Sequence, residues 1–311
     1  MLSGIYNYLV KNNPEARNIF ASIDKYNQQR KDSKPKGLPL GVKILLEAKY
    51  GSKWRDKIRG KTIKIPFVPK KFEIEYEKVL LKYFKNHFTK QINKVSKEII
   101  NDIKTRQDDI RADMMEQRFY DSFDRIEKEA NYAELGLEII ITHTARKLYD
   151  YHKEKFSYSI KKVFGIAIQL NDENVINNLP KWTKTNLNLI KNVRHEVIPK
   201  LKSQVTNAFQ NGIRASELQE QIQKITGYTE YRAKLIARDQ IGKLYGQMNR
   251  QCSTDLGLES YIWRTSGDER VRPRHRQLDG ETRRWDEGII PGEEIRCRCN
   301  GESVVDDKLL Y

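Results

Sequence analysis

The residue types best suited to chemistry are concentrated in the last sixth of the chain. Cys297 and Cys299 are separated by a single residue, and His275 precedes them in the same segment. Two thiolates and an imidazole are ligands that tetrahedral Zn²⁺ prefers. We therefore consider His275, Cys297 and Cys299 as three ligands of one structural zinc ion. The first candidate for a fourth ligand is Asp268, and the others are Asp279 and Cys252.

Other interpretations of these residues stay open. The C-x-C spacing is tighter than the spacing usual in zinc modules, so the cysteines are also explained as free buried thiols that pack as small apolar groups. His275 is explained equally by an ordinary hydrogen bond to an aspartate. A disulfide between Cys297 and Cys299 requires exposure to an oxidant.

A catalytic centre is the remaining alternative. Asp268, His275 and Asp279 together would suit a metal-dependent nuclease, because carboxylates and an imidazole can hold an ion that activates water. However, nothing nearby marks a nucleophile or a base, and the sequence lacks the common nucleotide-binding, hydrolase and deaminase motifs. We therefore expect that the protein is not an enzyme.

Short strands are expected to position these side chains. Residues Ser260–Thr265 and Glu294–Cys299 have strand-like patterns, and Ser303–Val305 is a candidate third strand. Alternate residues of a strand share a face, so Cys297 and Cys299 would project together. The module is thus expected to be a small α+β fold.

Turns and aromatic side chains complete the expected module. The segment Asp268–Arg272 has opposite charges close together, which predicts a turn held by Asp–Arg pairs. Asp279 and Gly280 suit a tight turn, since glycine tolerates a positive φ. Trp263 and Trp285 are expected to close the small core from two sides.

The order of these residues resembles the phage Mu F-like minor head protein, or phage head morphogenesis, family. The resemblance rests on Trp263, Asp268, Arg270, Arg272, His275, Asp279, Gly280, Pro291, Gly292, Cys297 and Cys299. It continues upstream through the helical segment Ala233–Asn249, where Asp239-Gln240 stands in place of the family's usual Thr-Glu. It covers about a quarter to a third of the chain.

The resemblance implies a structural component of a phage virion. Such a protein is made in the cytoplasm of the bacterial host and lies in the capsid interior. Its implied partners are the portal protein, the inner capsid and packaged double-stranded DNA, which it would accompany at ejection. Two alternatives from other classes are a metal-dependent DNA-processing or toxin-like enzyme and a soluble DNA-binding protein.

The charge distribution adds a candidate DNA contact. The 311 residues carry a formal net charge of +16, and residues 1–70 hold 16 Lys and Arg against 5 Asp and Glu. A basic segment can neutralise phosphates and release counterions. The candidate contacts are Lys53, Arg55, Lys57, Arg59, Lys61 and Lys64. The alternative is an ordinary solvated surface. Residues 267–300 hold eight arginines and eight acids, so this segment is not a cationic patch.

Cysteine usage and hydropathy indicate the compartment. Three cysteines, no secretory segment at the N-terminus and no apolar run approaching ~20 residues predict a reducing cytoplasm and no membrane insertion.

The whole chain is expected to be mainly α, with elongated helical N-terminal and middle regions and a small α+β C-terminal module. The expected divisions are a basic N-terminal arm (1–70), a long-helix region (71–170), a helical platform (171–257) and the Mu F-like module (258–311).

Apolar periodicity predicts the individual helices. An amphipathic start (1–33) precedes a short helix at Val42–Tyr50, and Pro66 confines a strand at Thr62–Val68 to a sheet edge. One or two long helices are expected over 72–132, then a helix over 130–164 with an interruption at Gly136. A loop at 170–172 is followed by helices at 173–178, 181–211, 216–226 and 229–256. Gly212 and Gly227 are expected to end helices, and Pro199 to kink or restart one.

Overall fold

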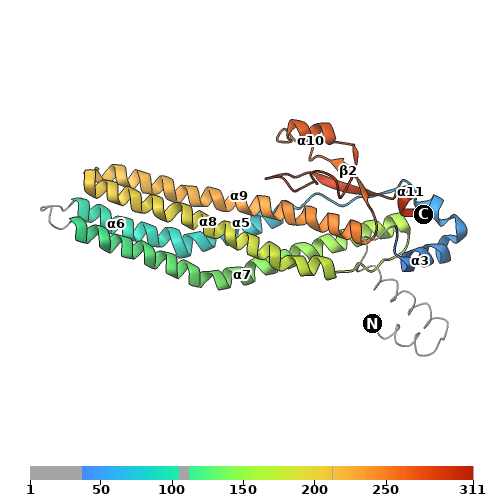
Figure 1. Ribbon diagram of the computed structural model, residues 1–311, viewed down its shortest axis with the longest axis horizontal. Coiled ribbons are helices and arrows are strands. Elements are labelled where there is room, and N and C mark those ends of the chain that lie inside the picture. The colour runs from blue at the N-terminus through green and yellow to red at the C-terminus, as the bar shows by residue number, and fades with distance from the viewer. Residues whose placement is uncertain (1–36, 105–111, 212, 311) are drawn as a thin grey trace, which may run out of the picture.

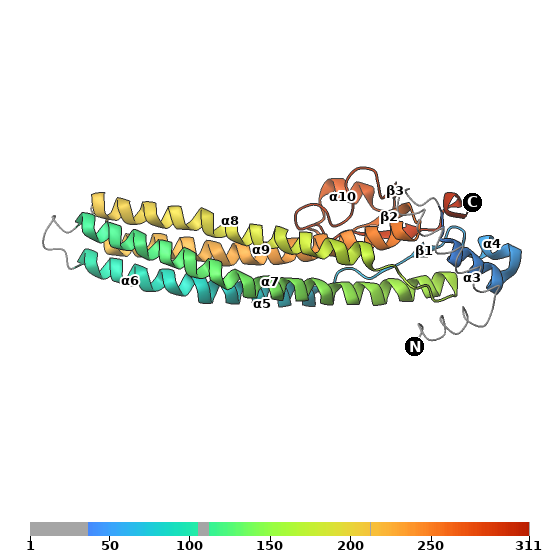
Figure 2. The same cartoon turned by 60° about the horizontal axis from the view of Figure 1, so that its bottom comes forward.

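The computed structural model describes residues 37–104, 112–211 and 213–310 (Figure 1). The expected amphipathic segment 1–33 lies outside these residues. Long helices lie side by side in an elongated bundle, and a small sheet with short helices rests on one side of it (Figures 1 and 2). The prediction of a mainly α protein with a small α+β C-terminal module is confirmed.

The first described elements lie at one end of the bundle. Helix α3 (Leu40–Tyr50) confirms the expected helix, and it is followed by a short 3₁₀ turn, η1 (Gly51–Lys53), and by α4 (Trp54–Ile58). Strand β1 (Thr62–Ile63) is shorter than expected, but it does lie at a sheet edge. Pro66 lacks an amide hydrogen, so it cannot prolong the pairing.

Four long helical segments form the bundle. The first consists of α5 (Lys70–Phe84), one turn of π-helix, η2 (Lys85–Thr89), and α6 (Lys90–Lys104). The others are α7 (Ala112–Phe164), α8 (Glu173–Asn211) and α9 (Ala215–Asp255). A 53-residue helix such as α7 is about 80 Å long. The bundle is therefore much longer than a compact domain of this size.

Three expected helix breaks, at Gly136, at residues 179–180 and at Gly227, are wrong, because α7, α8 and α9 continue through them. Helix α8 also does not restart at Pro199. A glycine costs a helix about 1 kcal/mol and an interior proline about 3 kcal/mol, and buried side chains on both sides of these positions outweigh such local costs. The expected loop at 170–172 is confirmed, because α8 begins at Glu173. The expected stop at Gly212 lies outside the described residues, between the end of α8 and the start of α9.

The C-terminal module is an antiparallel sheet with two short helices. It contains β2 (Ser260–Arg264), α10 (Pro273–Leu278), β3 (Thr282–Arg284), β4 (Asn300–Val304) and α11 (Asp307–Leu310). The strand order is β1-β4-β2-β3, so a strand from residues 62–63 completes a sheet that is otherwise C-terminal. The segment expected to be a basic arm therefore contributes an edge strand to the module.

The module has a small core of its own. Trp263 and Trp285 are buried there with Tyr261 and Ile290, and the rings of Tyr261 and Trp285 stack at 4.1 Å between centroids. The expectation that the two tryptophans close this core is confirmed. With so few large residues, the module depends on other contacts for its shape.

The expected strand at Glu294–Cys299 is wrong. These residues form turns followed by a short irregular stretch, and β4 begins only at Asn300. Arg296 has a φ of 60°, in the left-handed region, which interrupts an extended backbone. Part of the expected third strand, Ser303–Val305, lies in β4 instead.

Candidate metal centre

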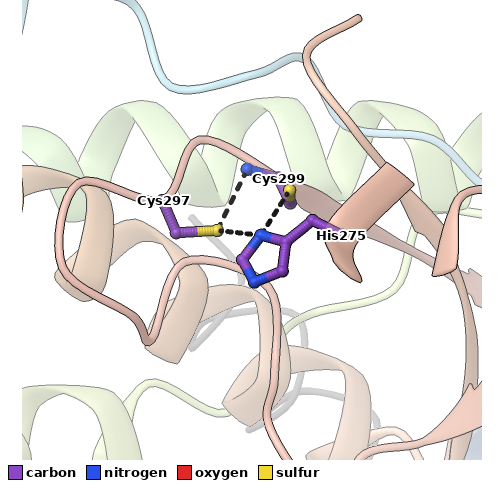
Figure 3. Close-up of side chains that lie close together, drawn as sticks. All are labelled: His275, Cys297 and Cys299. Atoms are coloured by element: carbon purple, nitrogen blue, oxygen red, sulfur yellow. Dashed lines mark hydrogen bonds between the residues drawn. The ribbon is translucent and has the colours of Figure 1, made fainter. Parts of the chain in front are cut away.

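His275, Cys297 and Cys299 meet at one point of the C-terminal module (Figure 3). The Nδ1 atom of His275 lies 3.7 Å from Sγ of Cys297 and 3.5 Å from Sγ of Cys299. The three ligand atoms all lie within 4.8 Å of one another. His275 and Cys297 are buried, and Cys299 is half-buried. The structure thus brings together the three candidate ligands that the sequence predicted.

The imidazole of His275 is held in one orientation. Pro273 begins α10, where its missing amide hydrogen costs nothing, and this short helix carries His275 toward the sheet. The edge of the ring contacts Trp263, with centroids 5.1 Å apart. On its other side, Nε2 donates to a carboxylate oxygen of Glu294 at 2.8 Å. This bond places the imidazole proton on Nε2, so the Nδ1 lone pair faces the two sulfurs.

Glu294 is itself held as a carboxylate. Burial raises the pKa of Glu294, but hydrogen bonds from Arg274 and His275 outweigh that effect and lower it overall. Arg272 lies 3.6 Å from the same carboxylate. Glu294 therefore remains a hydrogen-bond acceptor for His275 near neutral pH.

Cys297 lies where backbone donors converge. Its sulfur accepts the amide hydrogens of Gly292 and Cys299, each at 3.4 Å. A hydrogen bond from the Cys299 thiol, together with these two amides, lowers the pKa of Cys297 to about 6, while the same pairing and burial raise the pKa of Cys299. The hydrogen-bond donors around Cys297 therefore favour the thiolate at Cys297 over one at Cys299.

Helix α9 positions the loop that carries the cysteines. A carboxylate oxygen of Asp239 accepts the amide hydrogen of Arg296 at 2.9 Å. Over the next two turns, this face of the helix has glycines at positions 242 and 246. A β-carbon on Gly242 would lie 3.2 Å from the carbonyl oxygen of Cys297, and a β-carbon on Gly246 would overlap the carbonyl oxygen of Pro291. The two glycines allow the loop to lie directly on the helix backbone.

An amide network attaches the sheet to the same helix. Asn249 of α9 donates to the carbonyl oxygen of Gly301 at 2.8 Å and to the side chain of Asn300 at 3.2 Å. Asn300 in turn donates to the carbonyl oxygen of Ile65 at 3.0 Å. These contacts join three segments that are far apart in the sequence.

A cavity of about 280 Å³ opens beside the three residues. It is lined by His275, Cys297, Cys299 and Asp268 and by five arginines, which are Arg238, Arg270, Arg272, Arg296 and Arg298. Three of these arginines have carboxylate partners: Arg238 lies 3.6 Å from Glu73, Arg272 pairs with Glu294, and Arg298 pairs with Asp268. Five arginines against the three carboxylates that pair with them leave the cavity cationic.

The proposed fourth ligands lie elsewhere. Asp268 lines the cavity, where it pairs with Arg298 and accepts the amide hydrogen of Arg270 at 3.1 Å, but it is not part of the ligand group. Asp279 accepts the amide hydrogen of Thr265 at 2.9 Å. Cys252 is buried in the bundle, 3.9 Å from Nδ1 of His152, where burial raises its pKa to about 12. The structure therefore does not assemble Asp268, His275 and Asp279 as one ligand set.

The motif residues have mainly structural contacts. The predicted Asp–Arg pair exists, but Asp268 pairs with Arg298 rather than with Arg270 or Arg272, and both partners are about a third exposed. Arg272 donates to the carbonyl oxygen of Ile295 at 2.6 Å. Gly280 has a φ of 86°, as expected for its turn.

Sequence reasoning missed Glu294, Asp239 and Asn249 as parts of the site. Glu294 was expected in a strand, where its side chain would have faced away from Cys297. Asp239 was recognised only as a residue that differs from the usual threonine of the family. No local pattern signals the role of Asn249, because its partners lie about 50 residues away.

The candidate DNA contacts lie at the end of the bundle near α11. The side chains of four lysines are exposed here: Lys53 at the end of η1, Lys57 in α4, and Lys61 and Lys64 after α4. Two other candidates contact the C-terminal segment: Arg55 donates to the carbonyl oxygen of Leu310 at 2.9 Å, and Arg59 pairs with Asp307 at 3.0 Å. The four lysines are thus the candidates that best suit an external anion.

No helix in the described part of the chain combines the length and the apolar composition that a membrane span requires.

Comparison with known proteins gives a family-model match over residues 199–301. This segment matches the family model described as Phage Mu protein F like protein, which confirms the resemblance seen in the sequence. An uncharacterized protein of Haemophilus influenzae is 31% identical over 158 residues, which are 49% of this chain and 35% of that protein. The chain therefore spans about a third of the length of this curated relative. No solved structure matches the chain significantly.

Proposed function

We propose that the protein is a phage minor head protein, on the premise that residues 199–301 form a domain of the Phage Mu protein F like family. In this role it is a structural component of the virion, made in the cytoplasm of a bacterial host and enclosed in the capsid. It binds the portal protein or the inner capsid during head morphogenesis. It is not an enzyme.

The family match to residues 199–301 is the observation that carries this proposal. The architecture supports it, because the matched segment contains all of α9 and so joins the bundle to the module. Contacts of Asp239, Gly242 and Gly246 with the cysteine loop make helix and module one structural unit. A long bundle attached in this way allows a scaffold protein to contact partners at a distance, while the module provides a rigid docking surface.

The decisive experiment examines phage particles from the source. We expect mass spectrometry to find this polypeptide in purified particles, and chemical crosslinking to join it to the portal protein. A chain that is abundant in infected cells but absent from purified particles would contradict the proposal. If the chain is present in particles but crosslinks only to the inner capsid, the proposed head-protein function stands and its partner is the inner capsid.

A contact with packaged double-stranded DNA is a second part of the proposal. The exposed side chains of Lys53, Lys57, Lys61 and Lys64 support it. Each phosphate contact contributes about 0.9 to the slope of log affinity against log salt, so replacing all four lysines by glutamine should reduce that slope by up to about 3.6. The matched control replaces four exposed lysines of the bundle, Lys82, Lys90, Lys94 and Lys97. Equal slopes in both variants would place the DNA contact elsewhere.

The rival enzymatic function is tested with the same particles. We propose that His275→Ala and Cys297→Ala impair folding or incorporation into particles, because both residues belong to a buried structural group. Normal particles that have lost a nuclease activity present in the parent would favour the enzyme instead.

A further inference from the structure

We propose that His275, Cys297 and Cys299 bind one Zn²⁺ through Nδ1 and two Sγ atoms, and that the fourth coordination position opens onto the arginine-lined cavity. This inference does not depend on the proposed role in the phage head.

The distances suit a tetrahedral ion. A nitrogen and a sulfur bound to the same tetrahedral Zn²⁺ are about 3.5 Å apart, given bonds of about 2.0 and 2.3 Å. The observed separations from Nδ1 of His275 are 3.7 Å to Cys297 and 3.5 Å to Cys299. Both nitrogen–sulfur separations therefore suit a single bound ion, and all three ligand atoms lie within 4.8 Å of one another.

The surroundings are those of a metal ligand set. Glu294 accepts the Nε2 hydrogen of His275, the arrangement that orients a zinc-bound imidazole and increases its basicity. The sulfur of Cys297 accepts two amide hydrogens, which stabilise a thiolate. All of these donors and acceptors are held by the fold itself.

Free thiols explain the arrangement less well. Without an ion, the Cys299 thiol donates to the sulfur of Cys297, and one S–H is left for Nδ1 of His275, so only weak thiol hydrogen bonds hold the three side chains together. An ion satisfies both sulfurs and the imidazole together. It also links α10 to the loop that carries Cys297 and Cys299. Among the described residues, the module's own core cluster has four buried apolar side chains, and in so small a core a metal contributes directly to stability.

The fourth position follows from the placement of Asp268. This carboxylate pairs with Arg298 and is not part of the ligand group, although it lines the same cavity as His275 and both cysteines. The cavity has room for a small ligand, and its five arginines favour an anionic one. Three protein ligands and an exchangeable fourth ligand, either water or a small anion, are therefore expected.

The test begins with the intact chain purified from zinc-supplemented medium. We expect elemental analysis to find one zinc per chain. Replacement by Co²⁺ should produce the thiolate-to-cobalt absorption and the intense visible bands of a tetrahedral site, and inorganic phosphate should shift those visible bands. Folded parent protein that takes up neither ion would overturn the proposal without any need for a variant.

Matched variants then assign the ligands. Cys297→Ser, Cys299→Ser and His275→Gln should each lose the bound zinc, and Glu294→Gln should weaken its binding by about 10- to 100-fold. Cys252→Ser is the control, because this cysteine is buried in the bundle outside the group. Loss of zinc from Cys252→Ser, or its full retention in Cys299→Ser, would overturn the ligand assignment.

Asp268→Asn tests the open position. We expect this variant to keep one zinc per chain and to give an unchanged cobalt spectrum. A spectrum that changes, or a large loss of affinity, would make Asp268 the fourth ligand and would overturn the open position. If added phosphate leaves the cobalt spectrum of the parent protein unaltered, that result would also contradict an open fourth position.

Discussion

Asp239 in α9 accepts the backbone hydrogen of Arg296 at 2.9 Å, across 57 residues of sequence. Within the described residues, Arg296 is the only non-glycine residue with a positive φ. The bond therefore holds a backbone conformation that most residues avoid, immediately before Cys297. A carboxylate in the bundle thus determines the shape of the loop that carries the candidate metal ligands.

Removing this carboxylate should loosen the loop. We expect Asp239→Ala to lower the free energy of unfolding by about 1–3 kcal/mol, because it leaves the partly buried amide of Arg296 without an acceptor. Asp239→Asn keeps an acceptor oxygen and should cost less. Chemical denaturation measures both. Glu230→Ala, at an exposed position of the same helix, is the control and should change stability by no more than about 0.5 kcal/mol. Equal effects at Asp239 and Glu230 would contradict this role.

Two helical glycines should respond to alanine in opposite directions. A β-carbon at Gly246 would overlap the carbonyl oxygen of Pro291, whereas a β-carbon at Gly136 of α7 would meet nothing within 4 Å. Alanine is favoured over glycine in a helix by about 1 kcal/mol. We therefore expect Gly136→Ala to raise the melting temperature and Gly246→Ala to lower it. A stabilised Gly246→Ala protein would show that the loop does not pack closely on α9.

The buried His152 should make the protein less stable in acid. Complete burial lowers the pKa of His152 to about 3 from an ordinary value of 6.5. Cys252 and Tyr245 of α9 face its ring. Below about pH 6.5 the unfolded chain binds a proton that the folded chain excludes, so stability falls as the pH drops toward 3.

The contribution of His152 can be measured by substitution. His152→Gln should reduce the loss of unfolding free energy on acidification, by up to about 1.4 kcal/mol per pH unit between pH 6 and pH 4. His143→Gln, at an exposed position of the same helix, should leave the dependence unchanged. Unfolding by denaturant at several pH values provides the comparison. Parallel curves for the parent and His152→Gln would rule out this contribution.

A buried ion pair between α7 and α8 should be sensitive to loss of one partner. Arg194 is fully buried, pairs with Glu134 and donates to the side chain of Asn131 at 3.0 Å. We expect Glu134→Ala to cost about 3–5 kcal/mol, since it leaves a buried charge without a counterion. The double variant Arg194→Met/Glu134→Ala should be more stable than Glu134→Ala alone. Calorimetry compares the stabilities of the two variants. A double variant less stable than Glu134→Ala would mean that solvent reaches Arg194.

The controls for this pair lie on the surface. Lys224 and Glu220 form an exposed pair four residues apart in α9. Because exposed pairs contribute little, Glu220→Ala should change stability by less than about 1 kcal/mol.

Much of the helical architecture could be predicted, because an apolar stripe at helical spacing is a local property of the sequence. The positions of Gly136 and Gly227 could not be judged in the same way. A glycine costs a helix little, so packing of the residues on either side decided whether the helix continued through each of them. The expected strand at Glu294–Cys299 failed for a related reason, since the conformation of Arg296 depends on Asp239 in a distant helix.

The sequence by itself determined the chemistry of the candidate site, because one imidazole and two thiols with short spacing limit the ions that can bind. It also determined the long helices, through contacts between residues three and four apart. Only the tertiary structure decided that β1 completes the C-terminal sheet, that Glu294 orients His275 and that Asp268 pairs with Arg298. The physical reason is that these contacts join segments whose proximity depends on how the whole chain packs.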